Sequence, residues 1–224
     1  MCDLGDVLHM LVLAIDTSGR LGSIALAHGH EDGSCDVIEV VPLAGGTFSA
    51  QLVPQVAAFL SKHGFTKYHI DAFAVASGPG SFTGLRVGLS AVKGLAEVLK
   101  IPIATVTSLE LLIAASQVPS NVLAVLDAGR SEVYAGLQLV DNREELLLSV
   151  SEAAALAKER NLQVIAADAS LATSFEDSIV VSYHSSEVAA RIGIKKLLEG
   201  NTVDVLALDA NYIRRSEAEY KRIS

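Results

Sequence analysis

Ala76-Ser77-Gly78-Pro79-Gly80-Ser81-Phe82-Thr83-Gly84-Leu85-Arg86-Val87-Gly88-Leu89-Ser90 is the segment that decides the fold of this chain. The residues before it, Asp71 to Ala76, are mostly apolar and typical of a buried strand. After it, apolar residues recur at helical spacing from Leu85 to Leu99. The segment therefore predicts a strand, a loop with three glycines and the start of a helix. Such a junction leaves backbone N–H groups at a helix N-terminus, where an anion or another chain can approach closely.

The predicted helix carries more apolar surface than one packing contact needs. Its polar side chains form one narrow stripe: Arg86, Ser90, Lys93, Glu97 and Lys100. The small residues Gly88, Ala91 and Gly94 form a separate line, along which a second helix could pack closely. Two interpretations stay open: a helix enclosed in its own domain, or a helix shared with another subunit.

Composition narrows the class of protein. The chain has 224 residues, of which 50% are hydrophobic and 19% charged, enough for one large domain or two small ones. It has no apolar run of membrane-spanning length and no signal-peptide pattern, and residues 1–9 look like a short extension. Two cysteines, Cys2 and Cys35, favour a reduced compartment, so we expect a cytoplasmic protein. The net charge of −9 argues against a surface devoted to nucleic acid.

Residues 10–116 are predicted to form an N-terminal subdomain. The expected strands are 10–16, 23–27, 35–41, 71–76 and 102–106, and the expected helices are 49–63, 85–99 and a last one that ends at Ala115. Thr107 and Glu110 have the spacing of a capping box at the start of that last helix.

Residues 117–224 are predicted to form a C-terminal subdomain that follows the polar break at 116–121. The expected strands are 122–127, 132–139 and 163–167, and the expected helices are 151–160, capped by Ser151, and 186–198. A strand that ends in an acid, a turn and a return strand open each half, at Asp16 and at Asp127. This recurrence predicts a duplicated α/β architecture.

The two acid-containing turns are the candidate ligand sites. Asp16, Thr17 and Ser18 in the first turn, with Asp127 in the second, are weak candidates for binding phosphate or Mg²⁺. The alternative is that each aspartate closes its own hairpin as an Asx turn.

Other catalytic motifs are missing from the sequence. Gly84 is followed by Leu85 and Arg86, so the glycine loop is not a P-loop, and the residues around Ser81 do not form a nucleophile elbow. No histidine pair has metal-binding spacing, and His28 and His30 fall in a polar turn. We therefore expect no catalytic residue and no metal site.

The C-terminal residues concentrate cations: Tyr212, Ile213, Arg214, Arg215, Ser216, Lys221 and Arg222. This tail is either a solvated terminal segment or an interaction tail, and the sequence leaves both open.

Three motifs together are similar to the TsaB (YeaZ-type) family. They are Ile15-Asp16-Thr17-Ser18, the long glycine-rich segment from Ala76 to Gly94, and Asp127-Ala128-Gly129-Arg130-Ser131-Glu132-Val133-Tyr134. Residues 212–216 resemble the C-terminal motif of the same family. The resemblance covers nearly the whole chain from Met10.

The resemblance implies a duplicated actin-like ATPase fold of two subdomains. It also implies a role in forming threonylcarbamoyladenosine at position 37 of tRNAs that read codons beginning with A. In that family the chain is a non-catalytic partner of a larger homologue, the TsaD transferase, and the small ATPase TsaE docks on the pair. ATP and Mg²⁺ are used by the complex, this chain alone holds no cofactor stably, tRNA contact is indirect, and the chain alone forms a homodimer.

The resemblance also implies where the partner binds. The helices that follow Ser49 and Gly84 would face TsaD, through Leu52, Val53, Val56, Arg86, Val87, Gly88, Ala91, Gly94 and Val98. The alternative function is a weak Mg²⁺-dependent nucleotide hydrolase that uses Asp16 and Asp127. A peptidase lacks a nucleophile–base pair.

Overall fold

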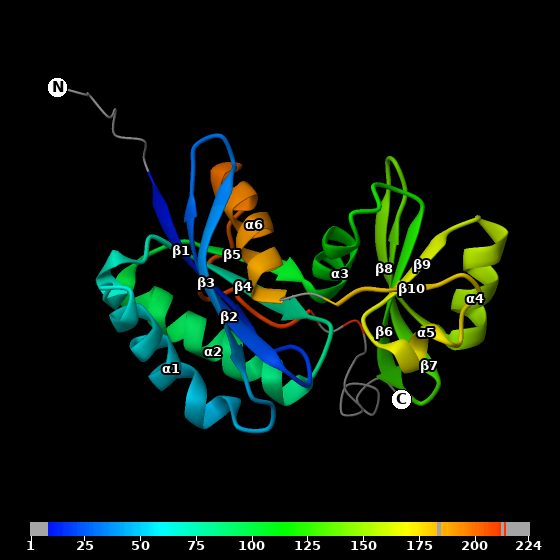
Figure 1. Cartoon of the computed structure of the whole chain (residues 1–224), viewed down its shortest axis with the longest axis horizontal. Helices are drawn as coiled ribbons and strands as arrows, with labels where there is room; N and C mark the ends of the chain where they lie inside the picture. The colour runs from blue at the N-terminus through cyan, green and yellow to red at the C-terminus, as the bar shows by residue number, and fades with distance from the viewer. Residues whose placement is uncertain (1–8, 183–184, 212, 214–224) are drawn as a thin grey trace. The chain divides into compact units, whose positions relative to one another are not determined.

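The computed structural model describes residues 9–182, 185–211 and 213 (Figure 1). These residues form two compact α/β units. Unit 1 contains residues 9–77, 81–106 and 185–210, and unit 2 contains residues 78–80, 107–182, 211 and 213. Residues 1–8, most of the predicted N-terminal extension, lie outside the described part, as do Tyr212 and residues 214–224 of the predicted basic tail.

Unit 1 is built on a five-stranded mixed sheet with the order β3-β2-β1-β4-β5. Its strands are β1 (Met10–Asp16), β2 (Gly22–Gly29), β3 (Cys35–Leu43), β4 (Ala72–Gly78) and β5 (Ile103–Thr107). β2 pairs antiparallel with both β1 and β3, whereas β1 pairs parallel with β4. The central strands β1 and β4 are buried along nearly their whole length, since helices cover both faces of the sheet.

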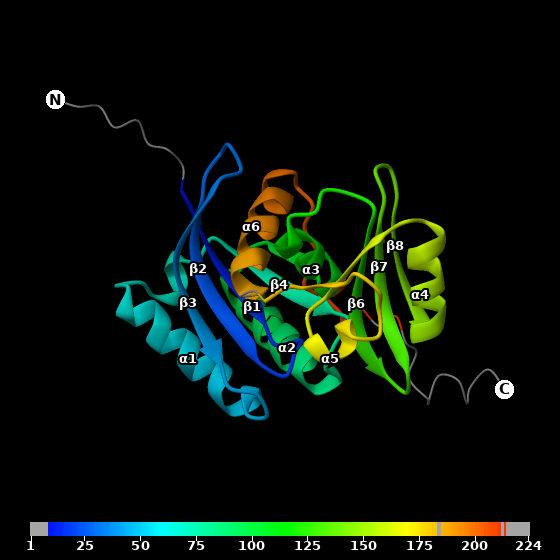
Figure 2. The same cartoon turned by 45° about the vertical axis from the view of Figure 1, so that its right-hand side comes forward.

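Helices α1 (Phe48–Lys62) and α2 (Phe82–Leu99) cover one face of this sheet, and α6 (Ser185–Leu198) covers the other (Figures 1 and 2). Leu13, Ile15 and Phe73 point from the sheet into the core under α1 and α2. On the α6 side a Cβ added to Gly193 would overlap Ala74, so glycine is what allows this helix to lie close to β4. A 3₁₀ turn, η1 (Lys67–His69), precedes β4.

Unit 2 repeats the same sheet topology, in the order β10-β9-β6-β7-β8. Its elements are α3 (Ser108–Ser116), β6 (Val122–Gly129), β7 (Glu132–Gln138), β8 (Arg143–Ser149), α4 (Val150–Glu159), β9 (Gln163–Ala166), α5 (Ala169–Ala172) and β10 (Ile179–Val180). β7 pairs antiparallel with β6 and β8, and β9 pairs parallel with β6 and β10. Two cores flank this sheet, one that includes α4 and one that includes α3. The predicted duplication of an α/β architecture in two subdomains is confirmed.

The division of the chain differs from the predicted boundary at residue 117 in two places. α3, which ends at the polar break, belongs to unit 2, where Leu109, Leu112 and Ile113 pack against the sheet. α6 and residues 199–210, which follow it, belong to unit 1. A helix is assigned by the core that it buries, and composition along the chain does not reveal that core.

Local details also differ from the sequence-based expectation. The Thr107–Glu110 capping box is present, but α4 is capped by Ser149 rather than Ser151. The sequence did not predict β8, α5 or β10. β8 begins with Arg143, Glu144 and Glu145, which hide the strand pattern, and the other two elements are four and two residues long.

None of the helices in the described part of the chain is long and apolar enough to cross a membrane.

Candidate functional site

A groove runs along the outer surface of unit 1 between α1 and α2. It has a volume of about 590 Å³. Its lining residues come from the first half of each helix: Ser49, Leu52, Val53, Phe82, Thr83, Arg86, Val87, Ser90 and Ala91. Five of the nine residues that we predicted at a partner surface therefore line one groove.

The rim of the groove exposes apolar side chains. Val53 is 55% exposed and Phe82 49% exposed, and further along α2 Val98 is 67% exposed. The guanidinium of Arg86 lies over the ring of Phe82, 3.8 Å from its centroid, which is the geometry of a cation–π contact. The groove thus combines an apolar lining with one cation held in place by an aromatic ring.

Phe82 belongs to the groove, although sequence reasoning missed it. It was missed because the helix was predicted to begin at Leu85, whereas α2 begins at Phe82 with Ser81 as its N-cap. The spacing of Phe82 and Arg86, four residues apart, is the signal that could have revealed the pair.

The remaining predicted interface residues divide by orientation. Gly94 is exposed, and no described atom lies within 4 Å of a Cβ built on it. Val56 is buried at 6% exposure in the core beneath α1. Gly88, which we expected on the partner surface, is instead buried, and a Cβ there would overlap the Thr17 hydroxyl. Successive residues of the line 88–91–94 are three apart and so turn by about 60° around the helix, which carries the line from the inner to the outer side.

The turn between β1 and β2 packs directly on the N-terminus of α2. The Thr17 hydroxyl donates to the carbonyl of Gly84 over 2.7 Å, and the Ser81 N–H donates to the carbonyl of Ser18 over 2.7 Å. A Cβ on Gly84 would overlap the Thr17 carbonyl oxygen. The turn between β1 and β2 therefore packs against the glycine-rich loop, at the place where the sequence suggested that an anion could bind.

Ser81 acts as a helix cap. Its hydroxyl accepts the N–H of Gly84 over 3.2 Å. This bond satisfies one of the N–H groups that a helix start leaves without a partner. Its role in the described part of the chain is structural and gives no support to a peptidase function.

Asp16 and Asp127 each close their own turn. The Asp16 Oδ1 accepts the Ser18 N–H over 2.7 Å, and the Asp127 Oδ1 accepts the Gly129 N–H over 2.8 Å. Asp16 is buried at 4% exposure, together with Thr17 and Ser18, whereas Asp127 is exposed. Both contacts are the Asx-turn geometry that was the alternative to a phosphate or Mg²⁺ site.

A search of the described residues for metal sites finds no group of three or more histidine, cysteine, aspartate or glutamate side chains that could hold an ion. His28 lies near the end of β2 and His30 directly follows that strand; the His30 Nε2 is 2.8 Å from the Asp36 Oδ2. Neither Asp16 nor Asp127 therefore belongs to a group of three such ligands in this part of the protein.

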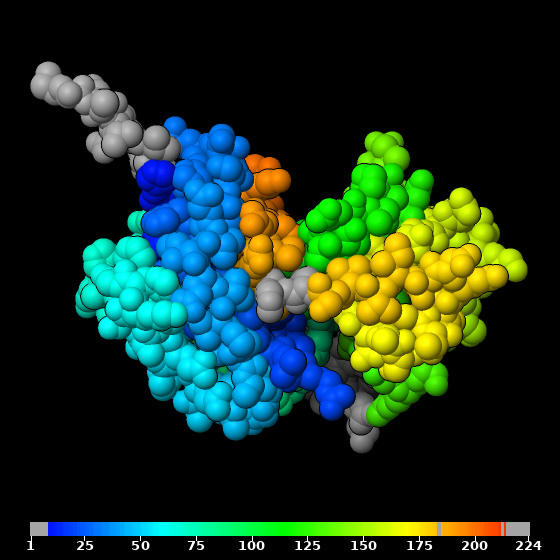
Figure 3. Space-filling view, in the orientation of Figure 1, coloured from blue at the N-terminus to red at the C-terminus, as the bar shows by residue number. Residues whose placement is uncertain are grey.

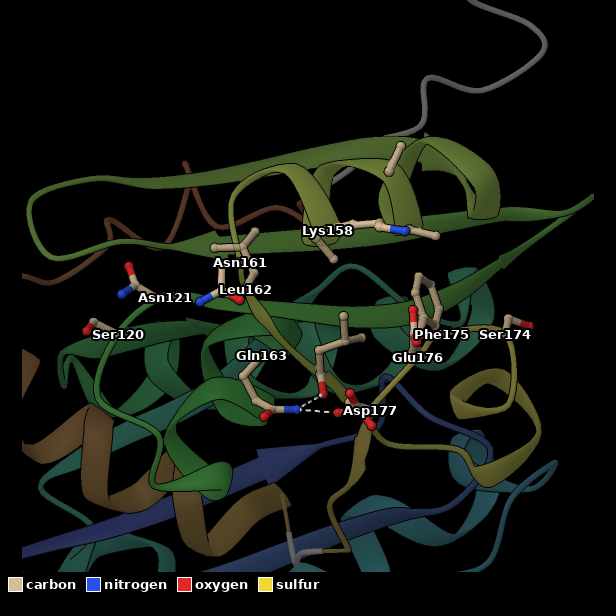
Figure 4. Close-up of a pocket in the computed structure, with 14 residues that line it drawn as sticks. Ser120, Asn121, Lys158, Asn161, Leu162, Gln163, Ser174, Phe175, Glu176 and Asp177 are labelled. Carbon is tan, nitrogen blue, oxygen red and sulfur yellow. Dashed lines mark hydrogen bonds between the residues drawn. The ribbon is translucent and has the colours of Figure 1, made fainter.

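Unit 2 has a larger hollow of about 820 Å³ at the N-terminal ends of β6 and β9 (Figure 4). Its floor includes Leu162 and Phe175, and Lys158 lies on its rim. The Gln163 side-chain amide donates to the Val164 and Asp177 carbonyls over 3.2 and 2.7 Å. None of the sequence-predicted site residues lies in this hollow, which is at the edge of the sheet opposite the one where ligands bind in open α/β sheets.

Comparison with known proteins identifies the relatives of this chain. The family model of TsaD, tRNA N6-adenosine threonylcarbamoyltransferase, matches residues 40–165. The tRNA threonylcarbamoyladenosine biosynthesis protein TsaB of Bacillus subtilis is 30% identical over 96% of this chain and 98% of its own length. TsaB of Haemophilus influenzae is 33% identical over 56% of this chain and 52% of its own length.

A solved structure has the same fold. YeaZ from Pseudomonas aeruginosa superimposes with a TM-score of 0.70 at 22% identity, over 90% of this chain and 100% of that chain. The similarity to the Bacillus subtilis relative extends over nearly the whole chain and so includes both units. This chain therefore belongs to the TsaB (YeaZ-type) family of tRNA threonylcarbamoyladenosine biosynthesis proteins.

Proposed function

We propose that this chain is the non-catalytic partner, a scaffold or activator, of a TsaD transferase. The product of the pair would be threonylcarbamoyladenosine at position 37 of tRNAs that read codons beginning with A. Membership of the TsaB family supports the role in threonylcarbamoyladenosine biosynthesis. The observation that carries the partner role is the groove between α1 and α2.

The groove has the properties of a surface that another protein covers. Val53, Phe82 and Val98 expose apolar area that a partner would bury, and complete burial of one such side chain is worth about 1.5–3 kcal/mol. Gly94, which has open space above it, would let a partner helix approach the backbone of α2 closely. We assign the contact to Val53, Arg86, Val87, Ala91, Gly94 and Val98. Leu52, which is only 1% exposed, lies beneath them in the lining of the groove.

The same surface accounts for the proposed homodimer. In the absence of TsaD, two copies of this chain would pair through the groove, because one apolar patch can be self-complementary about a two-fold axis. TsaE would dock on the heterodimer, and tRNA would be bound through the complex. ATP and Mg²⁺ would be used by the complex and not held stably by this chain, in the cytoplasm.

The turns of the two units support the absence of a catalytic role. An aspartate that serves as a nucleotide-hydrolase ligand needs its carboxylate directed at Mg²⁺ or phosphate. Asp16 and Asp127 each direct an oxygen at a backbone N–H of their own turn. No contact in the described residues favours the weak Mg²⁺-dependent hydrolase over the partner role.

Light scattering during size-exclusion chromatography tests the proposal, with the chain alone and mixed with its cognate TsaD homologue. We expect a homodimer alone and a one-to-one heterodimer in the mixture. Val53→Asp should abolish both, since it places a charge in the apolar lining. Val140→Asp is the matched control, because Val140 is 75% exposed and belongs to unit 2. A well-folded chain that shows no interaction would overturn the proposal and direct attention to Asp16 and Asp127.

A further inference from the structure

Three imidazole rings lie in contact at one end of the unit 1 sheet. His9 precedes β1, His28 is the last residue but one of β2, and His30 follows β2 where the turn to β3 begins. The ring of His9 is 5.8 Å from that of His28 and 4.6 Å from that of His30, both edge to face. We call these residues the histidine cluster; the β2–β3 hairpin to which two of them belong lies at the protein surface in Figure 3.

His28 is the member of the cluster whose ring has a buried nitrogen. Its Nδ1 atom is buried and has no hydrogen-bond partner among the residues that the structure describes. The charged or titratable groups around it are His9, His30, Asp36 on β3 and Asp71, which precedes β4.

Both nearby carboxylates are already engaged with other groups. Asp71 accepts the Leu11 N–H over 2.7 Å. Asp36, whose side chain is 78% exposed, contacts His30. A proton on His28 would therefore gain no direct carboxylate partner.

The charge balance around His28 has a definite sign. Burial lowers the pKa of His28 below its ordinary value of 6.5, the neighbouring His9 and His30 lower it further, and Asp36 and Asp71 oppose the shift. A histidine whose pKa is lower in the folded state than in an opened state loses stabilising free energy as the pH falls below the opened-state value. The loss begins near pH 6.5 and grows until the pH reaches the folded-state pKa.

The contacts of His28 decide which part of the protein responds. Its ring faces that of Phe65 across 6.3 Å, and Phe65 packs on the core under α1 and faces His69 across 5.9 Å. Gly29, the next residue, packs in the opposite direction against Ile194 of α6. A proton on His28 would thus weaken the packing of the strand ends against the segment that joins α1 to β4.

We propose that the histidine cluster forms an acid-sensitive contact. This contact holds the β2–β3 hairpin to the start of β1 and to Phe65, and acidification releases that end of unit 1. The opening is local: it is confined to the end of the sheet where Met10 and Leu11 pair with Gly29 and His28, while the remainder of β1, β4 and the groove residues of α1 and α2 stay folded. The device is independent of the partner role proposed above.

Hydrogen exchange with mass spectrometry on the full chain tests whether acid releases the hairpin. Exchange is measured between pH 7.5 and pH 5.5 and corrected for the intrinsic exchange rate. Protection of the β2–β3 hairpin should fall by up to about tenfold per pH unit between the two pKa values of His28. Peptides from the centre of β4 should keep their protection. NMR titration of the histidine rings of the unmodified protein should show His28 with a pKa below 6.5.

Two variants separate the cluster from the other histidines. His28→Phe keeps a ring against Phe65 and should remove the acid sensitivity of the hairpin. His63→Gln is the control: His63 pairs with Glu39 over 2.7 Å and lies outside the cluster, so this variant should retain the sensitivity. The inference is overturned if His28 titrates at or above its ordinary pKa, if the hairpin keeps full protection at pH 5.5, or if His28→Phe responds to acid as the unmodified chain does.

Discussion

Units 1 and 2 share one sheet topology and differ in the helix after the central parallel strand. In unit 1 β4 leads into α2, which has 18 residues and forms a groove with α1. In unit 2 the corresponding strand β9 leads into α5, which has four residues. A duplicated α/β unit can therefore keep its sheet in both copies while the helix after the parallel strand is long in one copy and a single turn in the other.

The hairpin turns show the same divergence. Both turns are closed by an aspartate that accepts the N–H two residues later. In unit 1 the turn is buried, and Thr17 and Ser18 bond to the start of α2. In unit 2 Asp127 is exposed, and the pairing of β6 with β7 is irregular between Asp127 and Gly129. The turn of unit 1 is thus part of a core, and the turn of unit 2 is a surface turn.

The largest expected difference between the units lies at their glycines. Gly84→Ala forces a methyl group into the Thr17 carbonyl, and such overpacking should cost about 3 kcal/mol of unfolding free energy. Gly129→Ala meets no described atom within 4 Å and suffers only from its φ of +71°, which costs about 1 kcal/mol. Urea unfolding of both variants measures the difference; equal midpoints would show that the turn of unit 1 is not packed as described.

A smaller difference is expected at the two aspartates. Asp16→Ala leaves the Ser18 N–H without its acceptor inside the protein, which should cost about 2 kcal/mol. Asp127→Ala exposes the Gly129 N–H to water and should cost less than about 1 kcal/mol. The same unfolding measurement distinguishes them. A larger effect at Asp127 than at Asp16 would reverse the assignment of buried and surface turns.

Sequence reasoning predicted the duplication and the strand–loop–helix junction because both depend on local pattern. The buried strands and the capping box at Thr107 are each formed by residues that are close together in the sequence. The units to which α3 and α6 belong were not evident from the sequence. α6 packs on β1, β2 and β3, which lie far back in the chain, and α3 packs on strands that follow the polar break taken as the boundary.

The structure places only some of the predicted partner-surface residues on the outer side of α1 and α2, and the reason is geometric. Periodicity identifies a line of small residues but not the direction in which each one points, so Gly88 was placed outside although it packs on Thr17. Phe82 was absent from the prediction because a helix start is hard to fix from apolar spacing alone. The orientation of a helix around its own axis is a tertiary property.

Titration calorimetry with the cognate TsaD homologue tests whether the surface along α1 and α2 binds the partner. It compares the affinities of the unmodified chain, Gly94→Leu and Ala155→Leu. Both positions are exposed and helical, one on α2 beside the groove and one on α4 of unit 2. Both variants should stay folded, because no described atom lies within 4 Å of a Cβ on Gly94 and the Ala155 side chain already points to solvent.

If the surface along α1 and α2 binds the partner, Gly94→Leu should weaken binding by about 100-fold, or about 2.7 kcal/mol, while Ala155→Leu binds like the unmodified chain. Equal affinities for the two variants and the unmodified chain would contradict the account.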